Sequence, residues 1–394
     1  MKQGPRKNSH LALLGAAHSF NHSLFVIAPP LLTMIMSSLN VSLTLMSTVA
    51  TIASFIYGFG ALAGGPLGDK IGEARTIAIS LAFSGLSTFI MLATWITGSV
   101  YVYGLALVLM ASWASLYHPT ANSLISKAFK GKVAESMGLH GVGGTAGVVL
   151  TPVVAWFVGV NFGWAWAFVV FGIACIALAL IFAKNFERSE SRKAKGGTII
   201  DALKIRELWT LLILNVMIGL FMKSVELFFP TYLKDNRGVD QMWASVAYTL
   251  ILAVGVPGQW IGGKASSKIG SKKVLNATMF GICLGLLLLI LVPTYFVGIA
   301  AFIVLYGLAF YAHQPALNSL TGFLSPQDQR GAVFGIFFFT SFGIGSLSQM
   351  ATGVLADAYG FDIAFWMITA FAFAALLLSF KIPDKRETGH PINA

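Results

Sequence analysis

Long apolar runs separated by short polar segments follow one another along the whole chain. Twelve of them are long enough for a membrane-spanning helix, which needs about 20 residues. They are predicted at 11–36, 43–64, 76–96, 99–126, 135–158, 162–183, 208–233, 242–263, 274–294, 297–324, 332–356 and 362–380. The strands of a membrane β-barrel would alternate apolar and polar residues, and these runs do not. The pattern therefore predicts an all-α membrane protein with 12 transmembrane helices.

Composition narrows the class of protein. Of the 394 residues, 56% are hydrophobic and only 10% are charged, whereas soluble globular chains carry about 25% charged residues. This balance excludes an ordinary soluble enzyme, a disordered chain and a disulfide scaffold. Cys175 and Cys283 both lie inside apolar stretches, so neither a disulfide nor a cysteine metal site is expected. The first apolar run ends at Pro29 and Pro30 without a cleavage site, so we interpret it as a retained first span.

Basic residues predict the orientation. Of the 26 lysines and arginines, 23 lie before the first span or in segments that follow even-numbered spans. Only Lys234 and Arg237 lie in a loop on the other side, and Lys223 lies within a span. The positive-inside rule then places both termini in the cytoplasm of a multi-pass protein of the cytoplasmic (inner) membrane. The net charge of +11 follows from this bias, and its dispersal over short loops argues against a nucleic-acid partner.

The two halves of the chain resemble each other at an offset of about 197 residues. The segment 65–75 after the second span matches 263–273 after the eighth. Pro119-Thr-Ala-Asn-Ser-Leu in the fourth span matches Pro315-Ala-Leu-Asn-Ser-Leu in the tenth. Matches between several separate segments at nearly the same offset would rarely arise by chance. A duplicated six-helix unit is typical of secondary transporters.

The repeat and the polar linker predict the domain organisation. We expect an N-terminal six-helix bundle at 1–183, a cytoplasmic linker at 184–207, and a C-terminal six-helix bundle with a short tail at 208–394. The two bundles should be related by pseudo-symmetry, with a substrate site near the midplane where they meet. Within the linker, residues 199–204 form a candidate short helix on the membrane surface.

The segment 65–75 resembles the loop signature of the major facilitator superfamily, and the repeat and topology extend that resemblance over the whole chain. The resemblance implies alternating access in a monomer, and it implies that this loop latches one conformation. Glycines in it permit a tight turn and close helix packing. The latch candidates are Gly65, Gly68, Asp69, Lys70, Gly72, Arg75 and Glu135.

A closer resemblance rests on three segments. The fifth span is rich in glycine from Gly138 to Pro152 and is similar to the fifth-helix motif of proton-coupled antiporters. The fourth span contains Tyr117-His118-Pro119, and the first contains His18-Ser-Phe-Asn21-His22. Together these segments resemble the fosmidomycin-resistance group of exporters. The resemblance implies proton-coupled efflux of a small compound.

Ionisable residues deep within spans usually mark a transport pathway. They lie on spans one, four, five, seven and ten, and in the superfamily spans one, four, seven and ten line the central cavity. The substrate-binding candidates are His18, Asn21, His22, Tyr117, His118, Asn122, Lys223, Glu226, His313, Gln314 and Asn318. The proton-coupling candidates are Glu226, His22, His118 and His140. Their spacing puts His18, Asn21 and His22 on one helix face and makes Lys223 and Glu226 neighbours able to pair.

Purely structural interpretations stay open for these residues: a histidine can bond a neighbouring carbonyl, and Lys223 with Glu226 can form a structural ion pair. The chain has no phosphate-binding loop, so transport should be driven by a gradient. It shows no nucleophile–base set, so neither enzyme activity nor a cofactor is expected. The expected partners are a small-molecule substrate, protons and membrane lipids.

Three transport functions fit this pattern. The favoured one is a proton-coupled exporter, or antiporter, of a small anionic or zwitterionic compound, because Lys223 and the histidines can bind negative groups and histidine titrates near neutral pH. An uptake or exchange carrier for a small organic or inorganic anion is the first alternative. A transition-metal carrier is the second: His18 and His22 could ligate one ion, with His118 or His313 completing the site.

Overall fold

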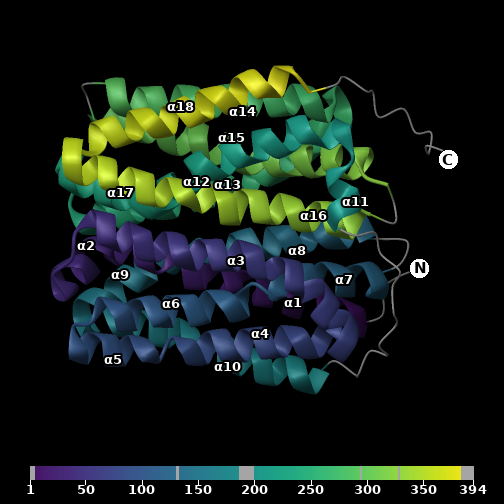
Figure 1. The fold of residues 1–394 in the computed structure, drawn as a ribbon, viewed down its shortest axis with the longest axis horizontal. Helices are drawn as coiled ribbons and strands as arrows, with labels where there is room; N and C mark the ends of the chain where they lie inside the picture. The colour runs from purple at the N-terminus through teal and green to yellow at the C-terminus, as the bar shows by residue number, and fades with distance from the viewer. Residues whose placement is uncertain (1–4, 130–132, 186–198, 293–294, 327–328, 383–394) are drawn as a thin grey trace.

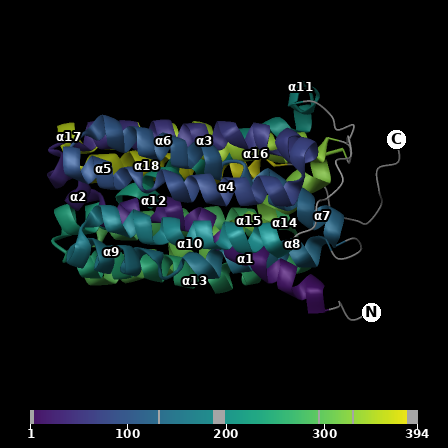
Figure 2. The same cartoon turned by 90° about the horizontal axis from the view of Figure 1, so that it is seen from below.

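The computed structural model describes residues 5–129, 133–185, 199–292, 295–326 and 329–382. Within them the chain is helical and contains no strand. The long helices run side by side along one axis in both views of Figures 1 and 2. We call the right-hand end of Figure 1, where α1 begins and α18 ends, the α11 end, and the opposite end the α2 end. The positive-inside rule predicts that the α11 end is cytoplasmic.

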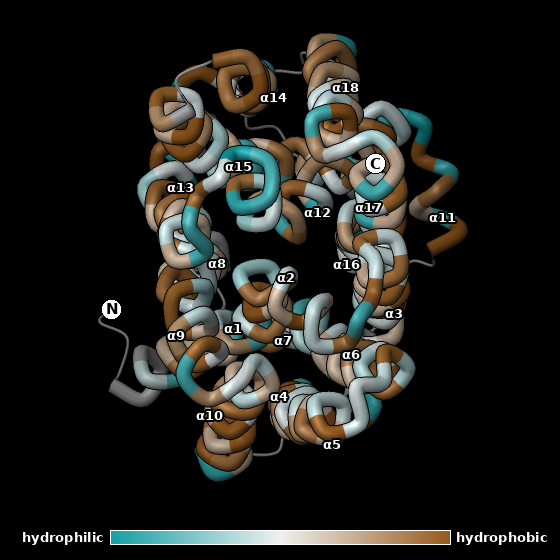
Figure 3. The backbone as a smooth tube through the Cα atoms, turned by 90° about the vertical axis from the view of Figure 1, so that its left-hand side faces the viewer, coloured by the Kyte–Doolittle hydropathy of each residue, from teal (hydrophilic) through white to brown (hydrophobic). Residues whose placement is uncertain are grey.

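The described residues contain 12 helical segments long and apolar enough to cross a membrane. Each overlaps one of the predicted spans, so the predicted all-α fold with 12 transmembrane helices is confirmed. Large apolar side chains are exposed on the outside, such as Ile96 at 82% and Phe296 at 69%. Figure 3 shows hydrophobic residues along the outer helices. Such a surface fits contact with lipid.

The first six spans are built from ten helices, because four of the spans are broken into two. The helices are α1 (Pro5–Val26), α2 (Ala28–Leu39), α3 (Leu43–Ile71), α4 (Glu73–Ser87), α5 (Ile90–Thr97), α6 (Val100–Ala114), α7 (Tyr117–Ala128), α8 (Val133–Val148), α9 (Thr151–Phe162) and α10 (Trp164–Asn185). Prolines explain three of the breaks, since Pro29, Pro119 and Pro152 lie in the first turns of α2, α7 and α9. The break after α4 contains Thr88, whose hydroxyl donates to the Gly85 carbonyl.

The remaining spans follow a short helix that lies in the predicted linker. The elements are α11 (Ile199–Leu203), η1 (Arg206–Leu208), α12 (Trp209–Arg237), α13 (Gln241–Ile269), α14 (Ser271–Leu291), α15 (Tyr295–Leu324), α16 (Arg330–Phe338), η2 (Phe339–Gly343), η3 (Ile344–Ser346), α17 (Leu347–Tyr359) and α18 (Phe361–Phe380). The eleventh span changes to a π-helical turn at η2, a feature that is common at functional sites.

Figure 3 shows α1–α10 grouped on one side of the molecule and α12–α18 on the other. This grouping fits the predicted bundles at 1–183 and 208–394, whose boundaries stay a prediction. Most of the linker between them lies outside the described residues. Its helix α11 is present as expected, packs near α16 at the α11 end, and exposes Ile200.

The internal repeat is visible in matching contacts. Ser23 bonds Thr151 at 2.9 Å between hydroxyl oxygens in the first half, and Ser224 bonds Thr352 at 2.8 Å in the second. Both pairs are 128 residues apart in the sequence. The loop signature also recurs, since the chain turns between consecutive helices at Gly72 with φ 94° and at Gly270 with φ 92°. Only glycine adopts such angles readily.

The two bundles are joined between the middle of the molecule and its α2 end. At the α2 end, Lys234 donates to the Thr33 hydroxyl at 2.9 Å and Gln241 donates to the Pro30 carbonyl at 2.7 Å. Near the middle, Thr51 donates to the Ser346 carbonyl at 3.1 Å. One further bond lies on the α11 side of the middle, where Thr145 of α8 donates to the Gln259 side-chain oxygen of α13 at 2.9 Å. The bonds at Thr33, Pro30 and Thr51 nevertheless close the α2 end of the interface between the bundles.

Candidate functional site

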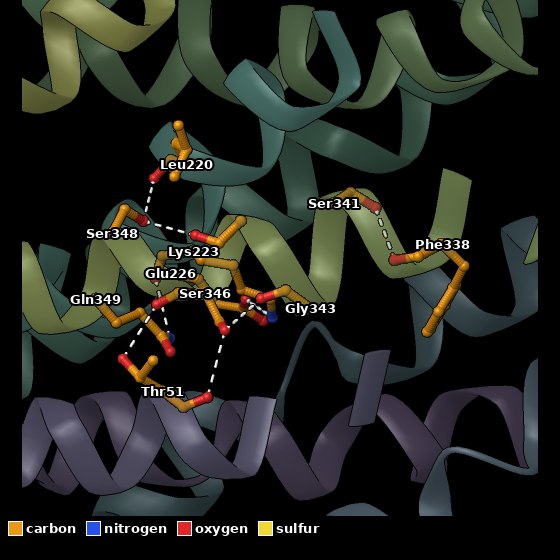
Figure 4. A network of polar contacts seen from close by, with 11 residues as sticks. Thr51, Leu220, Lys223, Glu226, Phe338, Ser341, Gly343, Ser346, Ser348 and Gln349 are labelled. Atoms are coloured by element: carbon orange, nitrogen blue, oxygen red, sulfur yellow. Dashed lines mark hydrogen bonds and ion pairs between the residues drawn. The ribbon is translucent and has the colours of Figure 1, made fainter. Parts of the chain in front are cut away.

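An ion pair on α12 faces the space between the bundles. Lys223 Nζ lies 2.6 Å from Glu226 Oε2, and Lys223 is only 3% exposed. The ammonium also lies 4.6 Å from the centre of the Phe342 ring, and Gln349 Nε2 donates to the Lys223 carbonyl at 3.3 Å. Figure 4 shows this network, with Thr51 of the N-terminal bundle facing it. The pairing expected from the i, i+3 spacing is present.

The ion pair lines a small cavity between the two bundles. Its apolar wall comes largely from the N-terminal bundle and includes Leu24, Phe25 and Met110, whereas its charges come from α12. Gln349 of α17 lines it as well. A cation with apolar surroundings attracts anions strongly, because the low local dielectric screens charge poorly. The described lining of the cavity thus contains one cation, Lys223, together with the carboxylate that pairs with it.

Four histidines of the N-terminal bundle form a second group, which we call the histidine cluster: His18 and His22 of α1, His118 of α7 and His140 of α8. The ring of His18 stacks on that of His140 with centres 4.3 Å apart, and lies 4.8 Å from His22 and 5.0 Å from His118. The His22 and His118 rings are 4.9 Å apart. His18, His22 and His118 are half-buried. The helices therefore bring together residues that are up to 122 positions apart.

The glycine-rich sequence of α8 explains how the cluster forms. Gly143 approaches the Gly15 backbone of α1, and a Cβ at Gly144 would collide with the His18 ring. Because α8 has no side chain at these positions, it packs close enough for its His140 carbonyl to bond His18 Nδ1 at 3.0 Å. The pattern that resembles the antiporter motif thus positions the first histidine of the cluster.

Aromatic rings lie between the ion pair and the histidine cluster. Phe338 and Phe342 stack with centres 4.4 Å apart, and both contact Tyr57 of α3. The Phe338 ring is 5.1 Å from the His118 ring, and Phe342 carries the Lys223 ammonium over its face. Since Tyr57 and His118 belong to one bundle and the phenylalanines to the other, movement of the bundles must rearrange these contacts.

Two predicted substrate ligands use their polar atoms within the N-terminal bundle. Asn21 is fully buried, donates to the Ala114 carbonyl at 3.0 Å and accepts from the Tyr57 hydroxyl at 2.9 Å. Tyr117 is also fully buried, and its hydroxyl donates to the Leu14 carbonyl at 2.7 Å. Positioning of α1 against its neighbours fits this geometry better than contact with substrate.

The predicted residues of the tenth span lie apart from the cluster. His313 is 3% exposed, and its Nδ1 is bonded to the Phe310 carbonyl of its own helix. The His313 ring packs on Phe310 and lies in none of the contacts that join the other histidines. Gln314 is half-buried, whereas Asn318 and its repeat counterpart Asn122 are exposed. His313 therefore does not complete the site suggested for His18 and His22.

The structure describes the latch candidates only in part. The side chains of Asp69 and Glu135 and the surroundings of Gly65 lie outside what the structure describes. A Cβ at Gly68 would lie 3.1 Å from Thr120 Cγ2 of α7, so this glycine permits close packing of α3 and α7. Lys70 and Arg75 are exposed, in keeping with contact with lipid headgroups or acidic partners.

Glu73, which follows the Gly72 turn, had no predicted role. It is 2% exposed, accepts a hydrogen bond from the Ser123 hydroxyl at 3.1 Å and pairs with Lys127. Its position in the first turn of α4, where a helix favours negative charge, is the sequence signal that could have identified it. Glu73 therefore ties the start of α4 to α7.

We expect the Glu73→Gln variant to unfold at a temperature a few degrees lower. A hydrogen bond to a charged group contributes about 1.5–3 kcal/mol. The side chain of Lys127 is 46% exposed, so solvent reduces the ionic part. The variant should therefore lose about 1–2 kcal/mol. Thermal unfolding in detergent measures this, with Glu207→Gln, at an exposed carboxylate, as the control. Identical melting of both variants would contradict the assignment.

Twelve apolar spans among the described residues, in two related halves with an ion pair between them, define a multi-pass membrane transporter of the secondary type. The chain belongs to the Major Facilitator Superfamily, whose family model matches residues 11–350. It is accordingly an integral membrane transporter rather than an enzyme, as the sequence predicts. The bacterial inner membrane is the location that fits its curated relatives.

The curated relatives include transporters with different named cargoes. The chain is 26% identical over 328 residues to the fosmidomycin resistance protein of Escherichia coli (strain K12), covering 81% of this chain and 79% of that protein. It is 24% identical over 378 residues to a protein of Cupriavidus necator named as a probable sulfoacetate transporter, covering 85% of this chain and 86% of that one. The resemblance to the fosmidomycin-resistance group is thus confirmed.

A solved structure shares the fold. A bacterial homologue of the human lysosomal transporter Spinster, in an inward-facing and unoccupied conformation, superposes with a TM-score of 0.78 and 16% identity. The match covers 96% of this chain and 97% of that one. The likeness concerns the fold, and the inward-facing conformation is that of the solved structure.

Proposed function

We propose that this chain is a proton-coupled transporter of a small organic anion and that Lys223 binds the anion. The observation that carries the proposal is the ion pair of Lys223 with Glu226 in a cavity lined by both bundles. Alternating access would expose this cavity first to one side of the membrane and then to the other. The protein would act as a monomer, with membrane lipids around it.

The ion pair offers a simple way to couple protons to the anion. When Glu226 is ionised, its carboxylate pairs with the Lys223 ammonium, and the same carboxylate would repel an arriving anion. When Glu226 is protonated, Lys223 becomes free to bind the anion through charge-assisted hydrogen bonds. The anion and the proton therefore bind together. Binding together favours movement of both in one direction, which is the uptake alternative.

Export stays the second candidate, and similarity to the fosmidomycin resistance protein supports it. In an antiporter the proton and the substrate would exclude each other. The titratable groups for that are the other coupling candidates, His22, His118 and His140. The relative named for sulfoacetate supports an anionic cargo without indicating its direction. The sign of the pH effect on substrate affinity distinguishes uptake with a proton from export in exchange for a proton.

We expect the anion to bind more tightly as the pH falls, because protonation of Glu226 frees Lys223. The Glu226→Gln variant should bind with little dependence on pH and should exchange the anion without accumulating it against its gradient. Proteoliposomes with an imposed pH gradient and labelled sulfoacetate, or a small phosphonate, measure accumulation and exchange.

Asp240→Asn is the matched control, because Asp240 caps α13 at the α2 end and asparagine caps equally well. The control should accumulate the anion as the parent does. Tighter binding at high pH would favour the exporter instead. Equal gradient-driven accumulation in the parent and in Glu226→Gln would refute coupling through this carboxylate.

A further inference from the structure

We propose that His18, His22 and His118 bind a divalent transition-metal ion of the zinc or nickel type. One ring nitrogen from each of the three lies within 4.8 Å of the others. In a tetrahedral site with zinc–nitrogen distances of about 2.0–2.1 Å, ligand nitrogens lie about 3.3–3.4 Å apart. Small rotations of the half-buried histidine side chains would bring the three nitrogens to the separation that a tetrahedral ion requires. The proposal goes beyond anion transport and does not depend on it.

The hydrogen bonds around the three rings suit metal binding. If His18 Nδ1 donates to the His140 carbonyl, at 3.0 Å, its Nε2 is left unprotonated and available to a metal. Such bonds to the second ring nitrogen are typical of metal-ligating histidines. His118 Nε2 is buried and has no hydrogen-bond partner among the described residues. A buried nitrogen without a partner is costly, and a metal ion would satisfy it.

The ligand chemistry selects the class of ion. Imidazole nitrogens suit zinc, nickel, copper and iron, whereas magnesium and calcium prefer oxygen ligands. The group of described residues that can hold the ion contains three imidazoles and no carboxylate. A tetrahedral ion held by three protein ligands keeps one position open. That position is available to water or to an acidic group of a transported molecule.

All three ligands come from the N-terminal bundle, on α1 and α7. Rocking of the bundles as rigid bodies therefore leaves the ligand set intact. The site should bind metal in both the inward-facing and the outward-facing states. A bound dication would also add positive charge on the far side of the aromatic rings from Lys223.

Metal titration of the purified full chain tests the proposal. The protein should carry a purification tag without histidine, and Zn²⁺ and Co²⁺ are the probes, with Mg²⁺ as the negative probe. We expect one Zn²⁺ per chain, no Mg²⁺ binding, and a visible absorption band of bound Co²⁺ with the intensity of a tetrahedral site. His22→Gln and His118→Gln should each weaken binding by at least about 10-fold.

His313→Gln is the matched control, since His313 is a buried membrane histidine outside the cluster. It should bind Zn²⁺ like the parent. Melting temperatures of all variants without metal show whether each is folded, and the Co²⁺ band reports the ligand set independently of affinity. The proposal fails if the parent binds no Zn²⁺, or if folded His22→Gln and His118→Gln bind it as tightly as His313→Gln.

Discussion

The Lys223→Gln variant should lose anion transport by about 100-fold or more. Lys223 is the buried cation of the cavity, and its ammonium is positioned by Glu226 and the Phe342 ring. A hydrogen bond to a charged group contributes about 1.5–3 kcal/mol, and each 1.4 kcal/mol is tenfold in affinity. Low dielectric around the cavity places the effect near the upper limit. Initial rates of anion uptake into proteoliposomes measure the loss.

Two further variants separate binding from folding. Lys223→Gln alone leaves the Glu226 carboxylate without its cation, so it should also melt at a lower temperature. The double variant Lys223→Gln with Glu226→Gln should recover stability but not transport. Lys264→Gln is the control, since Lys264 is exposed and lies over Trp260 on the outside of α13. A structural ion pair would give the opposite result, with transport restored in the double variant.

Gly58→Ala should reduce the turnover rate by about tenfold or more. Gly58 of α3 meets the backbone of η2 across the bundle interface. A Cβ added there would lie 2.6 Å from Gly343 Cα and closer still to Gly343 N. Backbone atoms cannot move aside like a flexible side chain, so α3 and η2 must separate and the packing between bundles must change. Transport rates, together with melting temperatures, measure the effect.

Gly138→Ala is the matched control for this change. Gly138 is also a helical glycine of the N-terminal bundle, on α8, but a Cβ there meets nothing within 4 Å. Helix propensity favours alanine over glycine, so Gly138→Ala should transport within about twofold of the parent and melt no lower. If Gly58→Ala turned over as fast as Gly138→Ala, close contact between α3 and η2 would not be needed for transport.

The sequence alone predicts most of the fold because a lipid environment constrains it strongly. A helix must satisfy its backbone internally and must be about 20 residues long, so apolar runs reveal the spans directly. Breaks within spans occur at Pro119 and Pro152, but Pro315, the repeat counterpart of Pro119, lies inside the unbroken helix α15, so proline alone does not predict them. The π-helical turn at 339–343 leaves no comparable signal. Spacing likewise predicts the pair of Lys223 with Glu226, since both lie on one helix face.

The composition of the candidate site could be predicted only in part, because contacts between helices depend on how each helix is rotated. Spacing puts His18 near His22, but nothing in a single sequence brings His118 to them and keeps His313 away. Asn21 has the residue type of a substrate ligand, and only its hydrogen bonds reveal a packing role.

Asp357, at the α2 end, also makes a contact between helices that the sequence alone does not predict. A carboxylate near the end of a span is expected to be solvated, and Asp357 is indeed exposed. It also accepts a hydrogen bond at 2.7 Å from the Thr44 backbone N–H of the other bundle, which the sequence did not indicate. Its role depends on which residues of a distant segment lie opposite it.

The paired bonds Ser23–Thr151 and Ser224–Thr352 have a consequence for how the halves have diverged. The two bonds identify equivalent positions in the two halves, because the same kind of bond occurs in each half with the same sequence separation. One residue before each serine stands His22 in the first half and Lys223 in the second. Corresponding positions in the two halves thus carry an imidazole on one side of the pseudo-twofold axis and an amine on the other. Exchanging His22 and Lys223 would reverse this asymmetry without creating a new polar position.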